Sequence, residues 1–174
     1  MDFRVLQGDI AQQEADALVN AAGTSLEMGS GVAGALLDAA NGPLERDAVA
    51  RGPVELGAVV VTDAYDLDVD YVIHAAAMSH SGPHPIATAE SLREATQNSL
   101  ETADNLDCKS LVLPLLGCGS GGFHTHEGAS LICDEIWAYE PTTLEDVRVI
   151  AYSDRERDII RQLVSDQQHP ETVD

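Results

Sequence analysis

The sequence predicts an α/β protein whose sheet is covered by helices on both faces. Two observations support this prediction. Short β-like runs alternate with helical runs along the chain, and two glycine-rich segments each follow a β-like run directly. The second observation is informative because ligands in α/β sheets lie at the carboxyl ends of the strands. With 174 residues, the chain is long enough for one domain with a single core.

Strands are expected where apolar residues alternate or run together. The first run, FRVLQG, is apolar at alternate positions, whereas ADALVNAA is apolar almost throughout and is typical of a buried strand. The expected strands, in chain order, are residues 3–8, 15–22, 57–64, 70–77, 110–116 and 146–153.

Helices are expected between these strands and after the last one. The first carries Val32 and Leu36 at helical spacing, and the second is opened by Pro43 and closed by Gly52. The third is long and amphipathic. The expected helices, in chain order, are residues 31–42, 43–52, 86–106, 127–139 and 154–164.

The composition is that of a folded chain without a membrane segment. Hydrophobic residues make up 44% of the sequence, which excludes a disordered protein, and no apolar run approaches the ~20 residues that span a bilayer. We expect one domain over residues 1–166 and a polar tail over 167–174.

The start MDFRVLQGD does not have the pattern of a secretory signal, and three cysteines without CxxC spacing indicate reduced thiols. Both features favour a cytoplasmic location.

The charge balance is strongly acidic. Thirty acidic residues stand against nine basic ones, only one of which is lysine, and the net charge is −21. Acid-rich, lysine-poor surfaces suit molar intracellular salt, where the screening length falls to about 3 Å. The pattern favours a halophilic protein, the alternative being a surface that repels nucleic acid or docks a basic partner. No basic stripe is present to neutralise phosphates, so nucleic-acid binding through a basic patch is not expected.

The stretch PLLGCGSGG, residues 114–122, matches several known motifs only in part. A dinucleotide fingerprint should open a helix at once, but the four residues 123–126 intervene. A P-loop would carry lysine where this chain has Phe123, and a nucleophile elbow would carry glycine where it has Cys118. These three interpretations are therefore disfavoured.

Two chemical alternatives remain open for the same loop. His124 and His126 are close in sequence to Cys118 and Ser120, so a Cys–His or Ser–His nucleophile pair is conceivable. The same histidines with a cysteine would suit zinc. Polar surface is the simpler interpretation of His-x-His in an exposed loop, so we expect neither a metal nor another cofactor.

An anion cradle is the interpretation that the two glycine-rich segments favour. Consecutive backbone N–H groups in a glycine-rich turn bind phosphate without basic side chains. The first segment reaches Gly31 and Val32, where a helix is expected to begin and its free N–H groups favour phosphate. Two such cradles would suit a diphosphate, or a phosphate with a sugar, although both segments would also serve as structural turns.

The chain resembles macro domains in a series of motifs that occur in the family's order. These are GDI at 8–10, ALVNAA at 17–22, LEMGSGVAGAL at 26–36, GAVVVT at 57–62, YVIHA at 71–75 and PLLGCGSGG at 114–122. The resemblance extends over about residues 2–166. It implies a three-layer α/β/α sandwich with a mixed, mostly parallel central sheet. It also implies binding of ADP-ribose or a closely related derivative, with an ADP-ribosylated protein as a further partner.

The resemblance implies roles for particular residues. Asp9 would accept a hydrogen bond from the adenine amino group, Ile10 would offer its backbone, and Tyr152 would pack against the adenine. The main-chain N–H groups of Ser30, Gly31 and Val32 would hold the diphosphate. The other residues expected to contact the ligand are Asn20, Gly117, Cys118, Gly119, Ser120, Gly121, Gly122 and Phe123.

Three positions depart from the family pattern, all on the side of the distal ribose. Gly23 stands where an asparagine normally bonds this ribose, and Ala33 stands where many hydrolases carry an aspartate. Gly121 replaces an aromatic residue that commonly covers the sugar. The GCGxGG motif resembles that of the terminal ADP-ribose glycohydrolases. The lysine nucleophile of that branch is not evident, however, since Lys109, the only lysine, lies at the wrong end of a strand.

Two functions therefore remain open, and no catalytic residue is assigned. In the first, the domain hydrolyses an ADP-ribosyl ester or glycosidic linkage, an acetylated ADP-ribose or ADP-ribose-1″-phosphate, through a water held by the substrate phosphate and the backbone. His80, His84, His124 or Asp154 would assist if one of them faced the distal ribose. In the second, the domain is a reader that binds ADP-ribose or a related nucleotide metabolite without turning it over.

Overall fold

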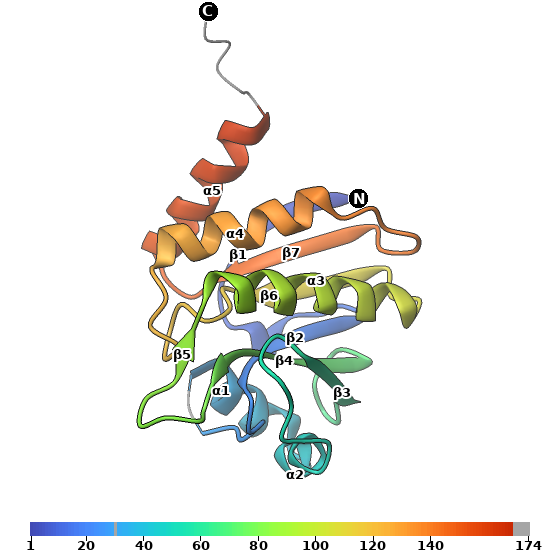
Figure 1. Ribbon diagram of the computed structural model, residues 1–174. Helices are drawn as coiled ribbons and strands as arrows, with labels where there is room; N and C mark the ends of the chain where they lie inside the picture. The colour runs from blue at the N-terminus through green and yellow to red at the C-terminus, as the bar shows by residue number, and fades with distance from the viewer. Residues whose placement is uncertain (30, 169–174) are drawn as a thin grey trace, which may run out of the picture.

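The computed structural model describes residues 1–29 and 31–168, which form a seven-stranded sheet with helices on both faces (Figure 1). The strands are β1 (Asp2–Gln7), β2 (Ala17–Gly23), β3 (Val59–Asp63), β4 (Tyr71–Ser79), β5 (Ile86–Ala87), β6 (Ser110–Pro114) and β7 (Asp146–Ala151). The helices are α1 (Gly31–Ala40), α2 (Leu44–Val49), α3 (Ala89–Asn105), α4 (Thr125–Ala138) and α5 (Asp154–Gln168), and a 3₁₀ turn, η1, spans Ile10–Gln12. Within these residues, none of the helices has the length and apolar character needed to cross a membrane.

The strand order is β1-β7-β6-β2-β4-β3, and β5 pairs with the end of β4. The neighbouring strands β1, β7, β6, β2 and β4 are all parallel to one another, whereas β3 and β5 run antiparallel to β4. The sheet is therefore mixed and mostly parallel, and the expected α/β/α sandwich is confirmed. Because the parallel strands all end at one edge, loops that are far apart in sequence meet there, at the left in Figure 1.

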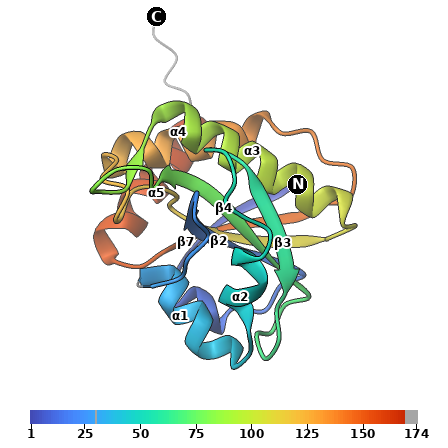
Figure 2. The same cartoon turned by 60° about the horizontal axis from the view of Figure 1, so that its bottom comes forward.

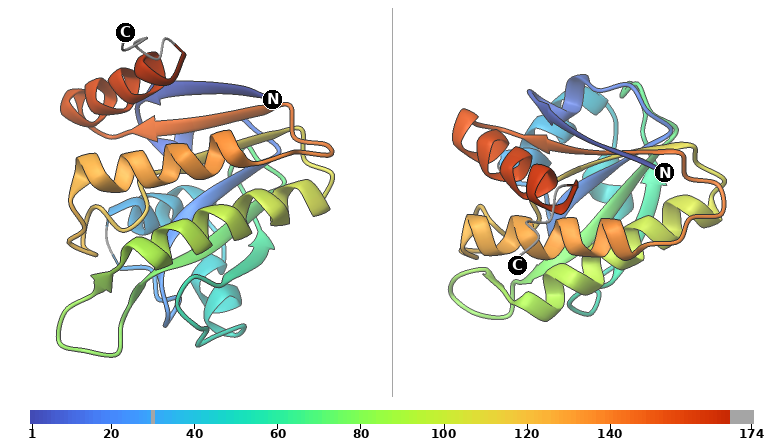
Figure 3. Two further views of the ribbon diagram at one scale, coloured as in Figure 1. Left: turned by 45° about the horizontal axis from the view of Figure 1, so that its top comes forward. Right: turned by 90° about the horizontal axis from the view of Figure 1, so that it is seen from above.

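Each face of the sheet is covered by its own set of helices (Figures 2 and 3). One core lies under α3, α4 and α5, and the other lies under α1, α2 and η1. Neighbouring residues of β2 point to opposite cores, so Leu18 packs with Leu36 of α1 while Val19 packs with Ile132 of α4. Both faces are dry, which explains why the parallel strands are apolar almost throughout.

Two short elements were not expected, and several helix boundaries differ from the prediction. The third helix, expected from residue 86, begins at Ala89, because Ile86 and Ala87 form β5. η1 and β5 were not expected, because η1 depends on a cap from Asp9 and β5 pairs only two residues with β4. Such tertiary contacts leave little trace in apolar spacing. The last helix continues to Gln168 instead of ending at residue 164, so it includes the first residues of the expected polar tail. The rest of that tail lies outside the described residues.

A buried polar relay crosses β2, β4 and β3. Asn20, His74 and Thr62 are all buried, with at most 2% of each residue exposed. Asn20 Nδ2 lies 3.0 Å from His74 Nδ1, and His74 Nε2 lies 2.9 Å from Thr62 Oγ1. Because an amide N–H only donates, Nδ1 accepts and Nε2–H donates, so the imidazole is neutral. Burial, and to a smaller extent the charge of Arg51, lowers the pKa of His74 to about 4.

The loop after β6 is packed tightly against β5. Gly121 is buried, and its carbonyl oxygen accepts a hydrogen bond of 3.1 Å from Ala87 N. A Cβ at Gly121 would lie 2.6 Å from Gly117 O, a backbone atom that cannot move aside cheaply. The glycine therefore follows from close packing inside the loop and does not leave an open pocket. Gly119, in the same loop, has nothing within 4 Å of an added Cβ.

Acid should destabilise the protein through His74. The folded-state pKa of about 4 lies below the unfolded value of 6.5, so between these values the unfolded chain binds a proton that the folded chain does not. The free energy of unfolding should consequently fall on the order of 2 kcal/mol between pH 7 and pH 4.5 through this group. Thermal unfolding midpoints across that range measure the effect.

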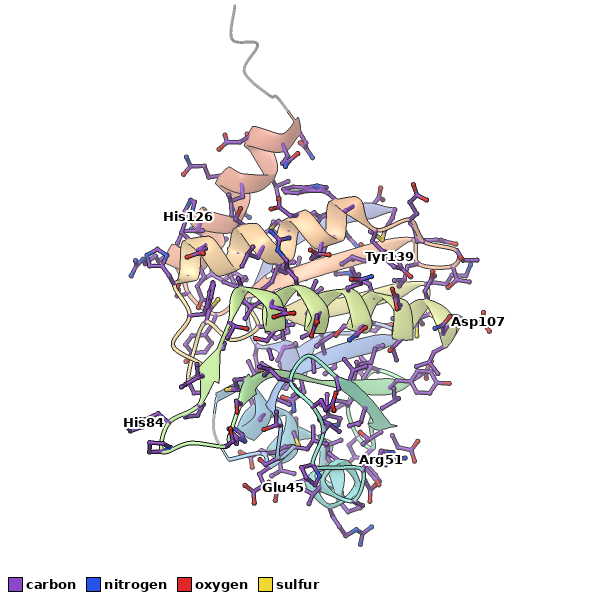
Figure 4. All side chains as sticks on the ribbon, in the orientation of Figure 1. Glu45, Arg51, His84, Asp107, His126 and Tyr139 are labelled. Atoms are coloured by element: carbon purple, nitrogen blue, oxygen red, sulfur yellow. The ribbon has the colours of Figure 1, made fainter. Side chains whose placement is uncertain are left out.

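The matched variants are His74→Gln and His84→Gln. The first should flatten this part of the stability profile, because it removes the titrating group from the relay. The second changes an exposed histidine on the loop between β4 and β5 and should leave the slope as it is (Figure 4). A slope that stays unchanged in the His74 variant contradicts the assignment.

Gly121→Ala should destabilise the protein more than Gly119→Ala. The first methyl group meets a backbone carbonyl, which we expect to cost about 1 to 3 kcal/mol of unfolding free energy. The second methyl group enters open space and should change that free energy by less than about 0.5 kcal/mol. Denaturant unfolding of both variants measures the difference, and equal stabilities would show that the loop is loosely packed.

Candidate functional site

A cavity of about 590 Å³ opens at the carboxyl edge of the sheet. It lies at the ends of β1, β6 and β7, beside the start of α1 and the loop after β6. Its lining residues are Gly8, Asp9, Ile10, Gly31, Val32, Ala35, Pro114, Leu115, Gly119, Ile150, Tyr152 and Glu156. Both the volume and the position are typical of small-molecule sites in α/β folds.

One end of the cavity joins η1 to the start of α5. Asp9 caps η1 through Oδ1, which accepts a hydrogen bond of 2.9 Å from Ala11 N, while Oδ2 has no partner among the described residues. Ile10 is buried beside it, and Tyr152 is 87% exposed at the rim. The backbone of Tyr152 is fixed by a 2.8 Å hydrogen bond from its N–H to Glu156 Oε2. This end therefore offers a carboxylate oxygen, an apolar wall and an exposed aromatic ring.

The other end of the cavity is made of backbone. Gly31 and Val32 begin α1, and the first N–H groups of a helix have no acceptor inside the helix. Gly31 has a φ of +61°, which favours glycine, and an added Cβ would meet nothing within 4 Å. The helix start therefore presents N–H groups and the positive end of a helix dipole to open space, which suits an anion.

The loop after β6 supplies a second set of N–H groups. Two hydrogen bonds of 3.0 Å close the loop, from Gly122 N to Gly119 O and from Phe123 N to Gly117 O. In the part of the chain that the structure describes, the N–H groups of residues 118–121 donate to no protein acceptor. Gly119 lines the same cavity as Gly31. Consecutive free amides of this kind form an anion-binding nest.

The side chains of this loop are not arranged for nucleophilic chemistry. Cys118 Sγ donates to Leu116 O at 3.4 Å, and burial, followed by the charge of Glu156, raises the pKa of the thiol to about 11. The thiol is therefore protonated at neutral pH. Ser120 Oγ donates to Met78 Sδ at 3.5 Å.

Two of the histidines on this edge of the molecule, His84 and His126, extend into solvent. His84 and His126 are both exposed, and they extend from separate elements in Figure 4. Among residues 1–29 and 31–168, no three His, Cys, Asp or Glu side chains are grouped as metal ligands would be.

The structure brings together about half of the residues that were expected to contact a ligand. The cavity lining includes Asp9, Ile10, Gly31, Val32, Gly119 and Tyr152. Asn20 lies away from the cavity in the buried relay. Ser30 lies outside the described residues. The remaining expected residues belong to the loop but do not line the cavity: Gly117, Cys118, Ser120, Gly121, Gly122 and Phe123.

Six residues of the lining were not expected from the sequence. They are Gly8, Ala35, Pro114, Leu115, Ile150 and Glu156. Ser153-x-x-Glu156 matches a helix capping box, and Glu156 N indeed donates to Ser153 Oγ at 3.2 Å. That pattern predicts where α5 starts. It does not show that Glu156 lines the cavity, because this depends on the packing of α5 beside β7.

A second, more open hollow of about 550 Å³ lies elsewhere on the sheet. Its lining residues are Arg4, Leu6, Gln13, Glu14, Ala15, Asp16, Ser110 and Arg148. The two arginines share one carboxylate, since Arg4 Nε and Arg148 Nε donate to Asp146 at 2.9 Å and 2.7 Å. Glu14 and Asp16 in the lining add two further negative charges, so the hollow has no excess of positive charge, and it contains none of the residues expected at a ligand site.

Related sequences cover most of the chain. The family model of the macro domain matches residues 19–132. An uncharacterised protein of Mycobacterium tuberculosis is 36% identical over 154 residues, which is 88% of this chain and 42% of the relative. The chain thus spans about two fifths of the length of that relative. An uncharacterised protein of Aquifex aeolicus is 35% identical over 150 residues, which is 86% of this chain and 90% of the relative.

Solved structures share the fold. A mutant macrodomain from Oceanobacillus iheyensis with ADPR has a TM-score of 0.85 at 25% identity, covering 94% of this chain and 92% of that chain. A macrodomain from Trypanosoma brucei in complex with ADP-ribose has a TM-score of 0.83 at 22% identity, covering 93% of this chain and 68% of that chain. The second likeness concerns the fold alone. The matched family model includes β2, α1 and the loop after β6, and this chain belongs to the macro domain family.

Proposed function

We propose that this domain binds ADP-ribose, or a closely related ADP-ribose derivative, in the cavity of about 590 Å³. The observation that carries the proposal is that the start of α1 and the loop after β6 line one cavity. Both present N–H groups to which the described residues offer no acceptor, so together they would hold a diphosphate from two sides. The Oceanobacillus iheyensis macrodomain with ADPR supports the same class of ligand.

The opposite end of the cavity suits adenine. The free Oδ2 of Asp9 would accept a hydrogen bond from the exocyclic amino group, whereas guanine would bring a carbonyl oxygen toward the same carboxylate. Ile10 would cover one side of the base. The exposed ring of Tyr152 would stack on it and lose contact with water.

Backbone recognition is well matched to the acidity of this chain. A basic pocket would be hard to maintain with a net charge of −21, but backbone N–H groups act at short range and need no basic side chain. We propose that the domain works in the salt-rich cytoplasm of a halophile. At molar salt the screening length is about 3 Å, which removes most of the long-range repulsion between the acidic surface and an anionic ligand.

Hydrolysis would need no protein nucleophile at this site. The Cys118 thiol is protonated and therefore a poor nucleophile. A water held between a ligand phosphate and the backbone amides would instead attack the ADP-ribosyl linkage, and the group attached to the ribose would leave with a proton from that water. Release of ADP-ribose from an ADP-ribosylated protein or from an acetylated ADP-ribose would support this activity. Tight binding of the same compounds without release would support a reader instead.

Titration with ADP-ribose in molar potassium chloride tests the proposed ligand. The heat of binding in a calorimeter should saturate at one ligand per chain. An absence of binding at millimolar ADP-ribose contradicts the proposed function, whichever of the two activities the site has.

Gly31→Glu should abolish tight binding. The new carboxylate would enter the open space beside the start of α1 and repel the diphosphate, so we expect a loss of affinity of roughly 100-fold. Gln162→Glu adds the same charge on the exposed face of α5 and should leave the affinity unchanged. Normal binding by a folded Gly31→Glu protein would place the phosphates elsewhere.

Asp9→Asn should weaken binding and relax the choice of base. Asparagine keeps an oxygen that can cap η1, so the fold should be preserved, but it removes the charged acceptor for the adenine amino group. We expect about a tenfold loss for ADP-ribose and a smaller difference between ADP and GDP. Competition titrations with ADP and GDP measure this difference, and an unchanged preference would mean that Asp9 acts only as a helix cap.

A further inference from the structure

His80 fills the space beside Gly23, where β2 and β4 end. A Cβ built on Gly23 would overlap three atoms of the His80 ring, Cε1, Nε2 and Nδ1. The imidazole and a side chain at position 23 therefore exclude each other. Gly23 is a strand residue, and it is not among the glycines with a positive φ. The backbone does not require glycine at this point, but a side chain here would force the ring of His80 out of its present position.

Hydrogen bonds hold the ring in this position. His80 N donates to Thr24 Oγ1 at 3.0 Å, and His80 Nδ1 lies 2.6 Å from Ser25 Oγ. Ser25 Oγ also accepts a weaker bond of 3.3 Å from Glu27 N, and it can still either donate to Nδ1 or accept from it. The other ring nitrogen, Nε2, has no hydrogen-bond partner in the described portion of the molecule.

The position of His80 continues the line of the cavity along the sheet. The cavity covers the ends of β1, β7 and β6, and the next two strands in the sheet are β2 and β4. These strands end at Gly23 and Ser79, directly before His80. A ligand with its adenine near η1 and its diphosphate at the start of α1 consequently extends its next group toward His80.

We infer that His80, oriented by Ser25, determines the specificity for the group that follows the diphosphate. The inference rests on the proposed ADP-ribose class of ligand and extends it beyond the cavity lining, to the ends of β2 and β4. The unpartnered Nε2 suits a sugar hydroxyl, which can accept a hydrogen bond from Nε2–H or donate one to an unprotonated Nε2. Where the family resemblance leads one to expect an asparagine on β2, this chain has a glycine and places an imidazole from the residue that follows β4.

Parallel titrations with ADP-ribose and ADP test the inference, because ADP ends at the diphosphate. The unmodified chain should bind ADP-ribose at least about fivefold more tightly than ADP. His80→Ala should lower the affinity for ADP-ribose about fivefold to tenfold and leave that for ADP within about twofold. His84→Ala removes an exposed histidine from the same loop and should change neither affinity.

Two further variants test the role of His80 without simply removing its side chain. The methyl group of Gly23→Ala must displace the ring, so this variant should lose the same preference, and adding His80→Ala should cause no further loss. His80→Gln retains a side-chain N–H donor and should recover part of the preference. Circular dichroism and thermal unfolding show which variants are folded, and the folded ones decide the question.

The possible outcomes separate this inference from the proposed function. Equal effects of His80→Ala on ADP and ADP-ribose, or no effect on either, would overturn the role of His80 and leave the proposed ligand intact. Equal affinity of the unmodified chain for the two ligands would do the same. A chain that binds neither ligand at millimolar concentration would instead contradict the proposed function.

Discussion

Backbone N–H groups to which residues 1–29 and 31–168 offer no acceptor are the feature on which the proposed ligand site depends. They occur at the start of α1 and in residues 118–121, and Gly31 and Gly119 bring both sets to one cavity. Keeping amides unpaired is costly in a dry interior, so they must lie at a surface that a ligand or water can reach. The carboxyl edge of a parallel sheet provides such a surface, because the loops there connect strands to helices.

The surrounding structure keeps these amides in place. Gly121 is packed against Gly117 O, and its own carbonyl accepts a hydrogen bond from Ala87 N of β5, so the loop after β6 is compact. The short strand β5 therefore has a clear physical role, although it pairs only two residues. Nearby, the ring of His80 occupies the space beside Gly23, so the ends of β4 and β2 are packed together as well.

Much of the fold could be predicted from the sequence, and part of the site could be as well. The order of strands and helices follows from apolar spacing, and the two glycine-rich segments lie at the same edge, as strand ends in a parallel sheet must. Side-chain roles that depend on neighbours across the sheet could not be predicted. Asn20 is engaged by His74, Gly121 is enclosed by its own loop, and Glu156 reaches the cavity only because α5 packs beside β7. No local pattern shows that His80 would occupy the space beside Gly23.

The most direct test of backbone recognition is a nuclear magnetic resonance titration of ¹⁵N-labelled protein in molar salt, with ADP and with adenosine. ADP should shift the amide resonances of Gly31, Val32 and residues 118–121 strongly, since hydrogen bonds to phosphate oxygens form at those N–H groups. Adenosine, which has no phosphate, should shift resonances near Asp9 and Tyr152 and leave the others in place. Saturation by ADP with no change at the amides of α1 and the loop after β6 would contradict the recognition of phosphate by these backbone N–H groups.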